Sequence, residues 1–192
     1  MLAPATELEA VNSILASIGE SPVSTLEDTG VVDAAMALRT LREVNREVQG
    51  RGWHFNMDED YPLAPTFPEG YIEVPRNAIR VEPSDPLDLI DFTVRGRRLY
   101  DKRNHTYKFE ETVKVKMVTL LPFEDIPQFA RNYISIRAAR IFQQNTVGSP
   151  ELSSFKDVDE ARALIQLKEA EADTADYNIL TDNRAVAGVL IR

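Results

Sequence analysis

The chain has 192 residues, of which 43% are hydrophobic and 28% charged, a composition that supports a folded core and argues against a disordered protein. Its formal net charge of −9 argues against a dedicated nucleic-acid binder, because such proteins are usually basic. The absence of cysteine excludes disulfides, thiolate metal sites and thiol nucleophiles.

The N-terminal segment predicts two helices joined by a short linker. Thr6 and Glu9 have the spacing of a capping box, and apolar residues then recur at helical intervals until Gly19, a typical helix-ending residue. Pro22 prevents simple continuation of this helix. A second helix is predicted from Asp33, as its N-cap, to Gln49. Its apolar stripe is Ala34, Leu38, Leu41, Val44 and Val48, and its expected outer ion pair is Glu43 with Arg46.

The pattern changes to short strands between residues 53 and 121, where six prolines exclude long helices. The segments that predict strands are WHFNM, GYIEV, AIRVE, LIDFTV, RRLYD and VKVKMVTLL. The hairpin signal is strongest at FTVRGRRLY, where Arg95-Gly96 separates two apolar runs. In the last segment apolar residues alternate with Lys114 and Lys116, which predicts one buried face and one wet face.

The last third predicts two more helices and a tail. Pro127 suits the start of a helix with a wide apolar surface, and Ser149-Pro150 suits the start of another that continues to about Tyr177. The remaining residues have no clear period and end in an apolar run from Val186 to Ile191. We therefore expect an α+β fold: a helical bundle from residues 1–52 and 122–177, an inserted β-rich domain at 53–121, and an extended docking tail at 178–192.

Charge is segregated along the chain. Residues 95–116 hold eight bases and three acids, whereas residues 151–176 hold eight acids and three bases. Patches of opposite sign on one chain are suited to contacts between subunits, where they set the register. The residues of the expected inter-subunit charge patch are Arg95, Arg97, Arg98, Lys102 and Arg103.

The sequence offers little for catalysis. His54 beside Trp53 is interpreted as a half-buried structural ring and His105 as a solvated hairpin-tip residue, since neither has a partner nearby in sequence for general-base work. The cluster Asp58, Glu59 and Asp60 has the residue type of a glycan hydrolase, which is one alternative function, but the three read more simply as loop acids. No metal, cofactor or catalytic site is expected.

A second alternative is a DNA-binding module. Tyr100 and Tyr107 flank the basic hairpin, as base stacking would require, but a charged hairpin also protects a sheet edge from aggregation. The N-terminus has neither the basic region nor the apolar core of a signal peptide, and no apolar run approaches the roughly 20 residues that span a bilayer. We therefore expect synthesis in a cytoplasm and no membrane contact.

The order of several longer segments is more specific than any of these motifs. They are ELEAVNSILASIGESPVSTLE, NREVQGRGWHFN, VRGRRLYD, LPFEDIPQFARNYISIRAARIFQQNTVGSPEL, DEARALIQLKEAEAD and YNILTDNRAVAGVLIR. Together they cover most of the chain, and the chain resembles the tail tubular protein A family of short-tailed phages related to T7. None of the segments is a catalytic motif.

The resemblance implies a structural virion protein rather than an enzyme. Members of that family form a dodecameric adaptor ring between the portal protein and the tail nozzle protein, and viral DNA passes through the lumen during ejection without sequence-specific binding. The implied fold is a helical bundle that bears an inserted β-rich domain. The family's C-terminal segment meets the portal, and the matching residues here are Asn178, Ile179, Leu180, Val186, Val189, Leu190, Ile191 and Arg192.

Overall fold

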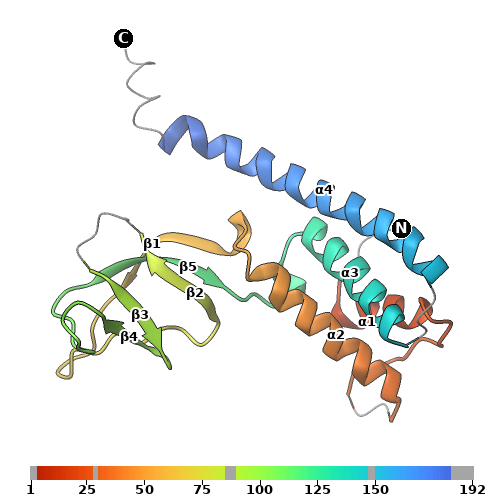
Figure 1. Ribbon diagram of the computed structural model, residues 1–192, viewed down its shortest axis with the longest axis horizontal. Helices are drawn as coiled ribbons and strands as arrows, with labels where there is room; N and C mark the ends of the chain where they lie inside the picture. The colour runs from red at the N-terminus through yellow and green to blue at the C-terminus, as the bar shows by residue number, and fades with distance from the viewer. Residues whose placement is uncertain (1–3, 28–29, 85–89, 147–149, 183–192) are drawn as a thin grey trace. The chain divides into compact units, whose positions relative to one another are not determined.

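The computed structural model describes residues 4–27, 30–84, 90–146 and 150–182, and it is α+β as the sequence predicts, with helices at both ends and strands between them (Figure 1). The chain divides into two compact units, Met1–Val48 with Pro122–Arg192, and Gln49–Leu121. The first unit contains α1 (Glu7–Ala16), α2 (Val32–Gln49, whose last residue belongs to the second unit), η2 (Phe123–Asp125), α3 (Gln128–Thr146) and α4 (Pro150–Asp182). The second contains η1 (His54–Asn56) and strands β1 (Met57–Leu63), β2 (Ala78–Pro83), β3 (Phe92–Arg95), β4 (Arg98–Asp101) and β5 (Val113–Thr119).

Helix α1 begins and ends where local chemistry predicts. The Thr6 hydroxyl accepts a hydrogen bond from the Glu9 backbone N–H at 3.2 Å, and the Glu9 carboxylate accepts one from the Ala5 N–H at 2.6 Å. Gly19 has a φ of 84°, the left-handed conformation that closes many helices. The linker then returns along α1, because the Asn12 amide donates to the Val23 carbonyl at 3.0 Å and accepts from its N–H at 2.8 Å.

Helix α2 differs from the prediction at its start and in its outer ion pair. It begins at Val32, so Asp33 lies in the first turn, where its negative charge is favourable beside the free N–H groups. Glu43 pairs with Arg39, four residues earlier, at 2.8 Å rather than with the expected Arg46. Arg39 lies four residues before Glu43 and Arg46 three residues after it, so both are neighbours of Glu43 on the helix surface.

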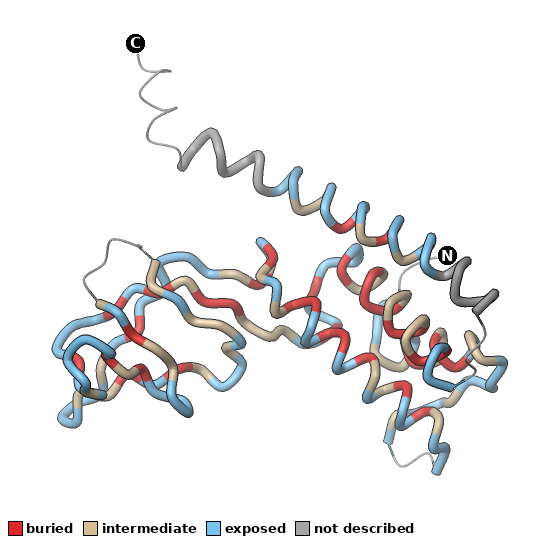
Figure 2. Tube along the Cα trace, viewed as in Figure 1, coloured by how far each residue is buried: buried red, intermediate tan, exposed pale blue. Residues whose placement is uncertain are grey.

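Helix α3 is the centre of the helical unit because it contacts both α1 and α4. Its buried residues therefore cover more of its circumference than a single neighbour would require (Figure 2). The buried apolar residues of this unit include Ala10, Val11, Ile14 and Leu15 of α1, Ala37, Leu41, Val44 and Val48 of α2, Ala130, Tyr133, Ile134, Ala138 and Phe142 of α3, and Ala163 and Leu167 of α4.

An ion cluster fastens the three long helices of this unit to one another. Arg137 of α3 contacts Glu160 of α4 at 2.6 Å and Glu47 of α2 at 2.8 Å, and Arg140 also hydrogen-bonds to Glu160. The Glu160 side chain is only 12% exposed. Burial by itself raises the pKa of this carboxyl, but the hydrogen bonds from Arg140 and Arg137 outweigh it and hold the pKa below the ordinary value of 4.5.

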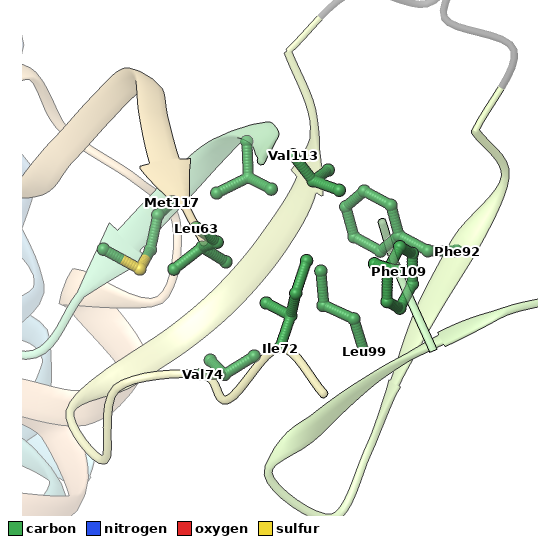
Figure 3. Packing of buried hydrophobic residues seen from close by; sticks show 9 residues of the cluster. Leu63, Ile72, Val74, Phe92, Leu99, Phe109, Val113 and Met117 are labelled. Atoms are coloured by element: carbon green, nitrogen blue, oxygen red, sulfur yellow. The ribbon is translucent and has the colours of Figure 1, made fainter. Parts of the chain in front are cut away.

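The β unit consists of a three-stranded antiparallel sheet of order β1-β5-β2 and the β3–β4 hairpin. The central strand β5 alternates as predicted, with Val113, Val115 and Met117 buried. These side chains form one hydrophobic cluster with residues of the hairpin and of the intervening loops, in which Ile72 and Leu99 lie side by side (Figure 3). The cluster consists of Leu63, Ile72, Val74, Phe92, Leu99, Phe109, Val113, Val115 and Met117.

Two predicted strands are wrong. In WHFNM, residues 54–56 form a 3₁₀ turn, because the Asn56 side chain accepts a hydrogen bond from the Trp53 N–H at 2.8 Å and so bends the backbone. In GYIEV, only single bridges form, Tyr71 with Lys108 and Glu73 with Arg98. Pro68 and Pro75 bracket this segment and limit its length.

Two buried amide side chains close the β unit where the chain enters and leaves it. The Gln49 amide donates to the Leu121 carbonyl at 3.0 Å and accepts from the Leu121 N–H at 2.9 Å. The Asn56 amide donates to the Gln49 carbonyl at 3.0 Å and to the Thr119 carbonyl at 2.9 Å. We call Gln49 and Asn56 the amide staple. Between them, Gly52 has a φ of 76°, and a Cβ there would lie 2.8 Å from Arg80 Nη2 and 3.0 Å from Val118 Cγ2.

Replacing Asn56 with alanine is expected to destabilise the β unit by about 3 kcal/mol, because several buried backbone groups lose their partner together. Urea unfolding followed by the fluorescence of Trp53, the one tryptophan of the chain, measures this unit directly. Asn77→Ala is the control, since Asn77 is exposed and Leu120 bonds only to its backbone carbonyl. An Asn56→Ala midpoint equal to that of the control would contradict the staple.

Replacing Glu160 with glutamine is expected to destabilise the helical unit by about 2 kcal/mol at neutral pH, because charge-assisted hydrogen bonds are lost. The pKa of Glu160 is lowered in the folded state, so its stabilisation is complete above pH 4.5 and disappears as the pH falls through the folded value. The gap between wild type and variant, measured by helical circular dichroism, should therefore shrink below pH 4.5. Glu169→Gln, on an exposed position of α4, is the control, and a pH-independent gap would refute the assignment.

Candidate functional site

Three surface features of the described residues bear on function: a basic hairpin, an acidic helix and a groove in the helical unit. Within the described ranges, no group of three or more His, Asp or Glu side chains is placed to hold a metal ion. None of the helices that the structure describes is both long enough and apolar enough to cross a membrane.

The two histidines lie on the surface. His54, predicted to be half-buried beside Trp53, is exposed in η1, because the 3₁₀ turn directs Trp53 and Asn56 inward instead. His105 is exposed in the turn at residues 102–105 with a φ of 54°, in line with a solvated loop residue.

The acid cluster lies in a strand rather than in the loop that was expected. Asp58, Glu59 and Asp60 are exposed on β1, an edge strand of the sheet. A bulge falls between Asp58 and Tyr61, with Asp60 at a φ of 55° and its N–H bonded to the Ser84 hydroxyl at 3.1 Å. Glu59 pairs with Lys116 of the neighbouring strand at 3.1 Å. The acids therefore shape and protect a sheet edge, which is a structural use of the same residues.

The predicted β3–β4 hairpin forms, with its loop one residue later than the expected Arg95-Gly96, and it presents arginines beside aromatic rings. Its loop is Gly96-Arg97, and the φ of 62° at Gly96 suits the first position of a tight two-residue turn. The Arg95 guanidinium lies 3.7 Å from the centre of the Tyr100 ring, and that of Arg98 lies 4.6 Å from the Tyr71 ring. Arg95, Arg97 and Arg98 are all exposed at this turn, and we call them the hairpin arginines.

The other two members of the predicted charge patch lie at the opposite end of the hairpin. Lys102 and Arg103 follow Asp101, which pairs with Phe92 at the far end of β3, about 10 Å along the strand from the turn. Lys102 contacts Asp91 at 2.6 Å. Backbone N–H groups of Asn104 and Arg103 bond to the Asp101 carboxylate, and these bonds hold its pKa below the ordinary value despite burial. The structure therefore divides the predicted patch into two ends.

Helix α4 carries the opposite charge. Its 33 residues extend about 50 Å, compared with 19 residues in α3. Its described side chains, 157–174, include six acids and two bases. Glu160 faces the arginines of α3, whereas Asp159, Glu169 and Asp173 are exposed. An acidic outer surface therefore remains available on this helix.

The predicted portal-docking residues fall at the end of α4 and beyond it. The helix ends at Asp182 instead of about Tyr177, so Asn178, Ile179 and Leu180 belong to its last turns and not to an extended segment. The sequence gives no proline or glycine there to stop it. Val186, Val189, Leu190, Ile191 and Arg192 lie outside the described residues.

Sequence reasoning missed a groove between α1, α3 and α4, with a volume of about 860 Å³. Six of its thirteen lining residues are small and leave space between the helices: Ala5, Ser13, Ser17, Ser135, Ala139 and Ala163. Ser13 and Ser17 are four residues apart, as are Ser135 and Ala139, so each pair lies on one helix face. This spacing could have indicated a face of small residues on each helix, but the sequence does not show which helices face one another.

Comparison with known proteins shows which family the chain belongs to. The family model described as tail tubular protein matches residues 8–177, which is most of the chain. The protein named tail tubular protein A from Klebsiella phage KP34 is 29% identical over 164 residues, covering 85% of this chain and 86% of that protein. The resemblance found in the sequence is therefore confirmed. The chain belongs to the tail tubular protein family, and it is a structural protein of the bacteriophage tail.

Proposed function

We propose that the protein forms an adaptor ring that joins the portal vertex to the tail nozzle and lines the DNA ejection channel. The observation that carries this proposal is the match to a tail tubular protein A along 85% of the chain, which spans both the helical unit and the β unit. In this role the chain is a structural part with no catalytic residue or cofactor. Its partners are further copies of itself in a dodecameric ring, the portal protein and the nozzle protein.

Ring closure requires head-to-tail contacts, in which two different surfaces of the same chain meet. The hairpin arginines and the exposed acids of α4 are such a pair, since they have opposite sign and come from different parts of the chain. Complementary charges of this kind steer association and set the register of neighbours. We assign the hairpin arginines to this contact because all three are exposed at one turn. Arg98 lies 3.8 Å from Glu73, whereas Lys102 is held more closely by Asp91, at 2.6 Å.

The C-terminal segment is the proposed portal-docking element. Its apolar residues from Val186 to Ile191 follow the long helix α4. Burial of such residues on a partner supplies affinity, and ordering the segment on docking limits premature assembly. Viral DNA passes through the lumen without sequence-specific binding, and the net charge of −9 discourages adhesion of DNA to the wall.

Deleting residues 183–192, which leaves α4 complete, is expected to abolish docking on the portal because the apolar segment is removed. Purified chain mixed with portal rings of the same phage should give a collar of density in electron micrographs, and the truncated chain should not. The substitutions Leu190→Asp and Ile191→Asp should reproduce the loss, with unchanged thermal unfolding as the control for folding. A collar formed equally well by the truncated chain would refute the docking role, and a folded full chain without a collar would refute the adaptor.

Reversing the three hairpin arginines to glutamate is expected to prevent ring formation, as is Glu169→Lys with Asp173→Lys on α4, because each change places like charges together. Mixing the two variants should restore rings, since the two kinds of chain can alternate with opposite charges at every contact. Sedimentation velocity on portal-nucleated assemblies measures this. Arg76→Glu, the same kind of charge reversal at one exposed arginine in another turn of the β unit, is the control. Rings from either variant alone would contradict the assignment.

A further inference from the structure

The loop between β1 and β2 presents an aromatic side chain almost entirely to solvent. Phe67 is 97% exposed, more than any other large hydrophobic side chain among the described residues. It lies between Thr66 and Pro68, with Pro65 before them, in a loop that belongs to the β unit. A single exposed apolar residue is ordinary on a protein surface, so its meaning depends on how the loop holds it.

The loop is closed by its own hydrogen bonds. The Thr66 N–H and hydroxyl both donate to the Tyr71 carbonyl, at 2.8 and 2.9 Å, and the Tyr71 N–H donates to the Thr66 hydroxyl at 3.2 Å. The Gly70 N–H donates to the Thr66 carbonyl at 2.7 Å. Gly70 also accepts a bond from Phe109 of the buried cluster at 2.9 Å, so the loop is joined to the core.

A pre-ordered loop with an exposed aromatic tip has the properties of an interface anchor. Little conformational entropy remains to be lost when the loop binds, because its backbone is already fixed. Aromatic residues that fill a pocket on a partner are among those that contribute most to protein–protein affinity. The conformation of this loop therefore favours insertion of Phe67 into a pocket of another chain.

A fitting pocket is present on the same protein. The groove of about 860 Å³ in the helical unit lies within the size range of binding clefts, roughly 300–1,000 Å³, and its apolar lining includes Ile136, Ala139 and Ala163. Glu9, Asp159 and Arg162 also line the groove. Arg162 is 74% exposed and lies 3.9 Å from Asp159, and an exposed pair of this length contributes little and leaves the guanidinium able to bind another carboxylate. Glu69 lies two residues after Phe67. An anchor and a pocket at different places on one chain produce a head-to-tail contact between copies.

We propose that Phe67 of one copy inserts into the groove between α1, α3 and α4 of the next copy in the ring, with Glu69 paired to Arg162. The inference rests on the proposed ring and identifies a contact within it that is separate from the charge pair.

Phe67→Ala is expected to weaken assembly on portal rings at least about tenfold, because the anchor is truncated at the centre of the contact. Thermal unfolding of the free chain should not change, since the side chain touches little of its own fold. Phe129→Ala is the matched control: it is the same substitution at a half-exposed phenylalanine of α3 that does not line the groove. Assembly of Phe67→Ala at the wild-type concentration would overturn the inference.

A photo-crosslinking phenylalanine analogue placed at position 67 identifies the occupant directly. In assembled rings it should crosslink to peptides that contain residues 132–139 or 159–166 of a second copy. Crosslinks to the portal, to the nozzle protein or to another region of the chain would overturn this contact while leaving the proposed adaptor intact. Failure of the wild-type chain to form any ring would remove both proposals, so the two failures are distinguishable.

Discussion

The β unit depends on one constraint, which is that its two ends must meet where the chain enters and leaves it. Two buried amides satisfy this constraint. The Gln49 side chain bonds to the backbone N–H and carbonyl of Leu121, and the Asn56 side chain donates to the carbonyls of Thr119 and Gln49. A buried backbone group without a partner is costly, so the staple couples the two ends strongly. With both ends held, the strands and loops between them can close a separate hydrophobic cluster around β5.

The helical unit is organised in a different way, around a helix that is buried on two sides. Helix α3 contacts α1 and α4, and its arginines Arg137 and Arg140 neutralise the largely buried Glu160 of α4, while Arg140 also contacts Asp157 at 3.4 Å. The charge on the inner face of α4 is therefore used for packing, whereas Asp159, Glu169 and Asp173 remain exposed. This division lets one helix hold its own unit together and still keep an acidic outer surface exposed.

A tail structural protein acts by being joined to others, and the described surfaces of this chain suit that task. The β unit supplies the hairpin arginines and a hydrogen-bonded loop with an aromatic tip, and the helical unit supplies the exposed acids of α4 and a groove. Surfaces that differ in charge and in shape favour repeated head-to-tail association over isologous pairing. Fixing the loop and the hairpin before assembly reduces the entropy that association must overcome.

The sequence by itself determined the features that depend on neighbours a few residues away. The Thr6 cap, the Gly19 helix end, the turn at Gly96 and the alternation in β5 were predicted because capping, backbone conformation and side-chain period are local. The α+β class and the family followed from the order of these segments.

Only the tertiary structure decided the features that depend on residues far apart in the chain. Asn56 turns the backbone at 54–56 and bonds to Thr119, 63 residues away. No local pattern in WHFNM predicts that partner. The five predicted patch bases separate to two ends of one hairpin because the paired strands β3 and β4 lie between the turn and the far end. The groove arises because small residues of three helices happen to face one another, and Glu160 is neutralised by arginines 20 and 23 positions away. Such contacts depend on how the whole unit packs. Hydrophobic periodicity and local propensity do not predict that packing.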